Sequence, residues 1–159
     1  MYRPLHDDTD ILAVFPLEKT LSLILTNKTY RKEILPISTM PGLVPARFSS
    51  SNILLTVYFD EFEVANPIGA YKKKHKLGGV YFSIANLNPQ HRSKLAGIHP
   101  LALIKMANSD DDLFKSLVEV MVGELNSVAS FQCEDQQFKA NVFAVIGDCL
   151  LYTSPSPRD

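Results

Sequence analysis

Two aspartates, Asp60 and Asp148, stand where this sequence is best suited to chemistry. Each directly follows a short apolar segment, Ile53 to Phe59 and Val142 to Gly147 respectively, that is typical of a strand buried on both faces. If the two strands are parallel neighbours, both carboxylates emerge at one sheet edge, where open α/β sheets bind ligands. Adjacent carboxylates repel unless a cation lies between them, and Mg²⁺ prefers oxygen ligands. The alternative is structural, because aspartate also favours turns.

A lysine cluster is the second candidate site. It consists of Lys72, Lys73, Lys74, His75 and Lys76. Such a cluster contacts DNA phosphates, and each neutralised phosphate adds salt-dependent affinity. The alternative is a solvated loop that connects two strands.

A run of three aspartates is better explained by helix formation than by metal binding. Asp110, Asp111 and Asp112 follow Ser109, so a serine cap precedes three carboxylates at the positive end of a helix dipole. The sequence also lacks a phosphate-binding glycine loop, a nucleophile elbow and a zinc-spaced Cys/His set. These absences argue against a nucleotide-binding protein, a serine hydrolase and a zinc finger.

The size and charge of the chain narrow its class further. Its 159 residues suffice for one domain with a core, and its net charge of -1 restricts any DNA site to a local patch. Two cysteines are too few for a disulfide framework. We see neither a signal peptide nor an apolar segment near the roughly 18 residues that a membrane helix needs. We therefore expect an intracellular protein without membrane contact.

The elements that must position the two aspartates are predicted from residue patterns. An amphipathic helix is expected from Phe15 to Leu35, ended by Pro36, and a Pro/Ser-rich loop then runs to Ser51. Four strands and a helix with one broad apolar face follow. A short helical turn is expected after the second strand, and residues 131–138, before the last strand, form either a short hairpin arm or a loop. The expected strands are 53–59, 77–85, 98–106 and 142–146, and the expected helix is 109–128.

The order of these elements predicts an α/β domain. Three strands, a helix and a fourth strand follow one another from Ile53. A helical crossover usually connects parallel strands, so the fourth strand should lie parallel to one of the first three.

Segments of the chain resemble the catalytic region of CACTA-type (En/Spm-like) transposases and related transposon-derived proteins. The resemblance lies in the segments Val57–Gly69, Lys74–Phe82, Asn86–Ser93 and Val142–Asp148, which occur in family order. Residues 16–35 also resemble the leucine-rich segment that often precedes this region.

The resemblance implies an RNase H-like core whose acidic triad binds Mg²⁺ or Mn²⁺ and acts on DNA, in the nucleus if functional. Asp60 would be the first acidic residue and Asp148 the second, while the third is expected further downstream. The neighbouring Glu61 and Glu63 are close enough to compete with Asp60 for the first position. A catalytically dead, transposon-derived binding or interaction domain is the alternative.

The last segment, Cys149 to Asp159, resembles the translation of a sequencing-library adapter. It replaces the asparagine- and glycine-containing segment that often follows the second aspartate in the family. The alternative is a genuine Ser/Pro-rich tail. We therefore expect an N-terminal helix and loop over 1–51, an incomplete RNase H-like core over 52–148 whose parent protein continues further, and an artefactual tail over 149–159.

Overall fold

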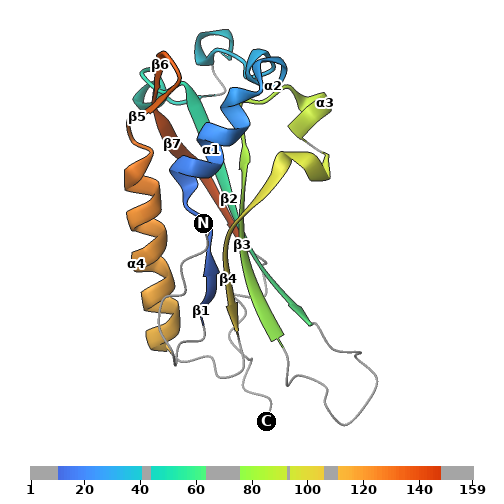
Figure 1. Cartoon of the computed structure of the whole chain (residues 1–159), viewed down its shortest axis with the longest axis vertical. Coiled ribbons are helices and arrows are strands. Elements are labelled where there is room, and N and C mark those ends of the chain that lie inside the picture. The colour runs from blue at the N-terminus through green and yellow to red at the C-terminus, as the bar shows by residue number, and fades with distance from the viewer. Residues whose placement is uncertain (1–10, 41–43, 64–75, 93, 106–110, 148–159) are drawn as a thin grey trace.

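A five-stranded mixed sheet organises the chain in the computed structural model, which describes residues 11–40, 44–63, 76–92, 94–105 and 111–147 (Figure 1). The strand order is β1-β4-β3-β2-β7. β2, β3 and β4 are antiparallel neighbours, β1 is antiparallel to β4, and β7 is parallel to β2. The predicted α/β class and the parallel strand after the helix are confirmed. The strands are β1 (Ile11–Val14), β2 (Ile53–Glu63), β3 (Lys76–Ile84), β4 (Ile98–Lys105) and β7 (Ala140–Gly147).

Helices and a small hairpin complete the described structure. Of the two alternatives for residues 131–138, hairpin arm or loop, the structure has the hairpin: its two strands are antiparallel, and its turn contains Glu134 at a φ of 52°. None of the helices in the described ranges has the length and apolar composition needed to cross a bilayer. The elements are α1 (Leu17–Thr26), α2 (Lys28–Lys32), α3 (Pro89–Arg92), α4 (Asp111–Ser127), the hairpin strands β5 (Phe131–Cys133) and β6 (Gln136–Phe138), and 3-10 turns at Ile37–Thr39, Ala46–Phe48 and Leu95–Gly97.

The core lies on one face of the sheet. Leu17, Leu21 and Leu25 recur every four residues on α1 and are fully buried. They pack in one cluster with side chains of β2, β3 and β4, with Leu117 of α4 and with the hairpin. Burying each leucine stabilises the fold by about 1.5–3 kcal/mol. α1 therefore belongs to the same core as the sheet.

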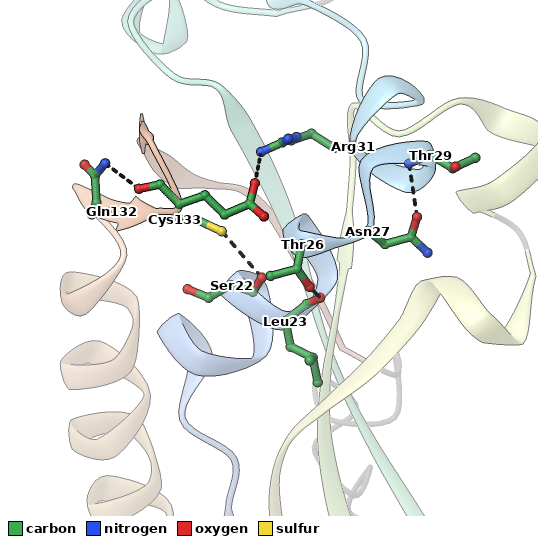
Figure 2. Close-up of polar contacts among 9 residues, drawn as sticks. Ser22, Leu23, Thr26, Asn27, Thr29, Arg31, Gln132 and Cys133 are labelled. Carbon is green, nitrogen blue, oxygen red and sulfur yellow. Dashed lines mark hydrogen bonds and ion pairs between the residues drawn. The ribbon is translucent and has the colours of Figure 1, made fainter.

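The predicted helix over 15–35 is two helices, because Asn27 interrupts it. The Asn27 side-chain oxygen accepts hydrogen bonds from the backbone N–H groups of Thr29 and Tyr30, both at 3.1 Å (Figure 2). Asparagine is a strong N-cap, so it starts α2 where α1 ends. The break turns α2 so that Arg31 reaches Glu134 of the hairpin at 3.2 Å, while the Cys133 thiol donates to the Ser22 carbonyl of α1.

The prediction that β7 is buried on both faces is wrong. Val145 is 70% exposed and Ile146 is 48% exposed. Among the described strands, β7 pairs only with β2 and forms an edge of the sheet. A continuous apolar segment therefore marks an edge strand here.

The apolar face predicted for 109–128 is only partly buried. α4 begins at Asp111, and Ser109 lies outside the described residues. Leu117 and Val128 are buried in the core, whereas Val118 and Val122 are 42% and 50% exposed. Val118 and Val122 are four residues apart, so they share the side of the helix that faces away from the sheet.

Asn86 joins three segments at one buried point. Its side-chain oxygen accepts from the Leu54 N–H at 2.9 Å, and its amide donates to the carbonyls of Leu35 and Asn52, both at 2.9 Å. The residue is fully buried. It therefore fixes the start of β2 against the segment after α2.

We predict that Asn86→Ala lowers the free energy of unfolding by about 3 kcal/mol. The buried Leu54 N–H loses a partner worth about 1–3 kcal/mol, and the carbonyls of Leu35 and Asn52 lose part-buried hydrogen bonds worth about 1 kcal/mol each. Urea denaturation measures the change. Asn88→Ala is the matched control: its side chain bonds Glu33 and the Gln90 N–H at less buried positions, so we expect a loss of about 1 kcal/mol. Equal losses in the two variants would contradict the central role of Asn86.

His99 is a half-buried titratable group in β4. Its ring lies 5.2 Å from the Phe82 ring, and its Nε2 is buried without a hydrogen-bond partner among the described residues. Burial lowers the pKa of His99 below its usual value of 6.5. The native state therefore favours the neutral imidazole, and the unfolded chain binds the proton more readily.

We predict that stability falls as the pH drops through about 6.5, because the unfolded state then binds more protons than the native state. Thermal or urea unfolding between about pH 7.5 and 5.5 measures the slope. His99→Phe should flatten it, whereas His91→Gln, which changes a more exposed histidine, should not. An unchanged slope in His99→Phe would show that His99 is not responsible.

Candidate functional site

The second face of the sheet carries the candidate site. Successive strand residues alternate between faces, so Thr56, Tyr58 and Asp60 share the face of β2 that is opposite the main core. Part of this face is covered near the start of β2, where Phe48 packs with Leu54 and Ala85. The end of β2 that carries Asp60 has no such cover from the described residues. The direct cross-strand partners on β3 are Ser83 for Thr56, Tyr81 for Tyr58 and Gly79 for Asp60.

Asp60 lies within β2 and not at its end. The strand continues to Glu63, whose partner is Lys76, so the expected end at Phe59 was too early. The Asp60 side chain is exposed and forms no ion pair with another described residue. Its cross-strand partner, Gly79, has no side chain, and the Tyr81 ring occupies the space above that glycine. The exposure of the Asp60 side chain is what leaves its carboxylate open to a ligand.

The register between β2 and β7 bears on the second aspartate. Phe59 of β2 is the partner of Gly147 of β7, and the two strands run in the same direction. Asp60 is the residue after Phe59, and Asp148 is the residue after Gly147. Asp148 itself lies outside the described residues.

A β-bulge sets this register. Leu55 is the partner of Val142 and Thr56 is the partner of Ala144, so Phe143 is an extra residue in β7. Its ring packs edge-on against Phe48 at 5.9 Å between centroids. Beyond the bulge, Ile146 is the partner of Tyr58 and shares its face of the sheet.

A hollow of about 560 Å³ opens on this face beside Asp60. Its described lining is mostly apolar and aromatic, and among the described residues Asp60 supplies the one carboxylate. Side chains come from β2, β3 and β7 and from the start of β4. The lining residues are Tyr58, Phe59, Asp60, Tyr81, Leu95, Ile98, Ile146 and Gly147.

The two tyrosines of the hollow point in opposite directions along the strands. The Tyr58 hydroxyl lies 3.1 Å from the Ser83 hydroxyl, toward the start of β2. The Tyr81 ring instead lies over Gly79, because a Cβ built on that glycine would overlap Cε2, Cζ and the hydroxyl oxygen of Tyr81. Since Gly79 faces Asp60 across the strands, the Tyr81 ring extends toward the end of the sheet that carries Asp60.

A second hollow of about 480 Å³ lies toward the start of β2 on the same face. Its lining includes Val44, Leu54 and Phe143, and Arg92 holds its edge by donating to the Ala85 carbonyl at 2.8 Å. Tyr58 and Ile146 line both hollows. The open face is therefore continuous from Phe143 to Asp60.

The other predicted site residues are largely outside the described residues. Lys72, Lys73, Lys74 and His75 are among them, and Lys76 is the first residue of β3. In the described ranges, no three His, Cys, Asp or Glu residues gather closely enough to hold a metal ion. Asp60 is therefore the one predicted carboxylate ligand whose surroundings the structure defines.

The sequence analysis missed Gly79, Tyr58 and Tyr81. Their strands were treated only as buried apolar segments. The signal that could have found them is the alternation in Val57-Tyr58-Phe59-Asp60, which places tyrosine and aspartate on one face. No protein-family model matches the chain, and no curated protein matches it with significant similarity.

Proposed function

We propose that this chain is part of a transposase-like protein whose intact form cuts and joins DNA strands at a divalent-metal site. The observation that carries the proposal is the parallel pairing of β2 and β7 with Phe59 opposite Gly147. Asp60 follows Phe59 within β2, and in the sequence Asp148 follows Gly147, the last residue of the parallel strand β7. Ligand sites of open α/β sheets occur at the edge where parallel strands end, and Asp60 lies in the last part of the pairing before β2 ends at Glu63.

The topology supports an RNase H-like core. The strand order β4-β3-β2-β7, the antiparallel β2–β3–β4 meander and helix α4 before a parallel β7 are all compatible with that fold. The family resemblance assigns two acidic residues in this chain. One follows Phe59 of β2, and the other follows Gly147 of β7 in the sequence. The strand order, on which this support rests, is independent of the resemblance.

The surroundings of Asp60 fit a hard divalent cation. Its carboxylate is exposed and has no cationic partner among the described residues, and it borders the hollow on this face of the sheet. Asp60 and Asp148 would hold Mg²⁺ or Mn²⁺, and a third acidic residue further downstream would complete the set. The bound metal would activate the attacking oxygen and stabilise the leaving oxygen of a phosphodiester.

The residues around the metal would bind and orient the DNA. A phosphate cannot approach the Asp60 carboxylate closely without a cation between them, since both are negative. Lys72, Lys73, Lys74, His75 and Lys76 precede or begin β3, the strand that faces Asp60, and would contact flanking phosphates.

A second candidate function is binding without catalysis. The observation that favours it is the apolar exposure of Ile146, which lines a hollow with a single described carboxylate. In that case the domain contacts DNA or protein and needs no metal. DNA affinity that is equal in EDTA and in Mg²⁺, together with the absence of a metal site at Asp60, would favour this alternative.

We predict that Mn²⁺ binds beside Asp60 and broadens the amide NMR signals of Gly79 and Gly147, which neighbour it across the strands. Asp60→Asn should reduce the broadening at least about tenfold at equal Mn²⁺, because the neutral amide loses the charge that attracts the ion. The measurement is a Mn²⁺ titration of the full chain.

The matched control is Asp135→Asn, which changes an exposed aspartate in the β5–β6 turn. It should leave the broadening at Gly79 and Gly147 unchanged. Broadening that persists in Asp60→Asn, or that is absent from the parent chain at millimolar Mn²⁺, would contradict the metal site.

A further inference from the structure

We infer that the Tyr81 ring is a stacking platform for an unpaired base of the DNA strand whose phosphate approaches Asp60. The inference rests on the proposed function and adds to it a preference for single-stranded or locally opened DNA. It concerns the hollow beside Asp60, which no step of the metal chemistry uses.

The position of the ring is the first step. Glycine at position 79 is what allows Tyr81 to lie along the sheet surface, since any Cβ there would overlap the ring. Asp60 is the cross-strand partner of Gly79. The Tyr81 ring and the Asp60 carboxylate therefore line the same hollow.

The freedom of the ring is the second step. The hydroxyl of Tyr58 is tied to Ser83, whereas that of Tyr81 has no hydrogen-bond partner among the described residues. Tyr81 is half-buried, so the ring is held by its surroundings while part of it stays accessible. It is an anchored aromatic surface next to the candidate metal ligand.

The chemistry of the lining is the third step. Ile98, Leu95 and Ile146 surround the ring with apolar surface, and Asp60 gives one charged edge. A nucleotide matches this arrangement, because its flat base is apolar on both faces and its phosphate requires a cation beside a carboxylate. Bases stack on aromatic side chains with little sequence preference. A base paired inside a duplex does not offer its face, so only an unpaired base fits.

The test compares single-stranded and duplex DNA in Mg²⁺, because the phosphate beside Asp60 needs a cation between them. The probes are a fluorescent oligothymidylate and a hairpin duplex of equal phosphate number, with affinities measured by anisotropy at several salt concentrations. Tyr81→Leu should weaken oligothymidylate binding about 5- to 100-fold, the range of one lost base stack. Duplex binding and the salt slope should stay unchanged, because phosphate contacts set both.

Three variants control the result. Tyr81→Phe keeps the ring and should bind within about twofold of the parent. Gly79→Ala keeps the tyrosine but displaces its ring, so its loss should match that of Tyr81→Leu. Phe143→Leu removes an aromatic residue at the far end of the same face and should have no effect. Thermal unfolding confirms that each variant tested is folded.

Several results would overturn the inference. They are equal losses for Tyr81→Phe and Tyr81→Leu, equal losses for single-stranded and duplex DNA, and no loss in folded Tyr81→Leu. The Mn²⁺ titration separates this failure from failure of the proposed function. If Asp60→Asn abolishes the broadening while Tyr81→Leu binds oligothymidylate normally, the stacking inference fails and the metal proposal stands. If Tyr81→Leu loses the oligonucleotide while the parent chain binds no Mn²⁺, the metal proposal fails and the base contact remains.

Discussion

Hydrogen bonding of β2 along both of its edges is the constraint on which the rest of the structure depends. β3 pairs with it antiparallel from Leu55 to Glu63, and β7 pairs with it parallel from Ile53 to Phe59. A strand held on both sides cannot shift its register without breaking two ladders at once. Its start is fixed as well, because the buried Asn86 amide binds the Leu54 N–H. The position of Asp60 is therefore determined by contacts that begin at the opposite end of the strand.

The two faces of β2 have different roles because the chain covers them unequally. Leu55 and Val57 pack in the core cluster to which α1 and α4 also contribute, so this face of β2 stabilises the fold. Tyr58 and Asp60 face the other side, where the described residues leave a hollow. Alternation along a single strand thus separates the core from the candidate site. The candidate residues are consequently set by the same backbone that the core makes rigid.

Much of the sheet could be predicted from the sequence, because its strands are short apolar segments separated by turn residues. The α/β class, the strands that became β2, β3, β4 and β7, and the parallel strand after a helix all followed from such patterns. The break at Asn27 was missed, since a leucine repeat continues to favour helix unless the cap formed by one asparagine side chain is recognised. β1 was also missed, because its partner β4 is distant in the sequence. The burial of β7 was overestimated, since an apolar segment does not reveal whether it has one neighbouring strand or two. Asp60 was predicted as a site residue from its type and position, whereas the closeness of Tyr81 and Gly79 to it follows only from cross-strand pairing.

The bulge at Phe143 shifts the pairing of the last part of β7 with β2 by one residue. With the extra residue, Ala144 and Ile146 fall opposite Thr56 and Tyr58, and Gly147 falls opposite Phe59. Without it, the alternation would be inverted, and Val145 rather than Ile146 would face the tyrosines. One added residue thus decides which side chains from this strand reach the hollow. A single-residue insertion or deletion between Ala140 and Gly147 would therefore move each later side chain of β7 to the opposite face of the sheet. The amino-acid composition of the strand would stay almost unchanged.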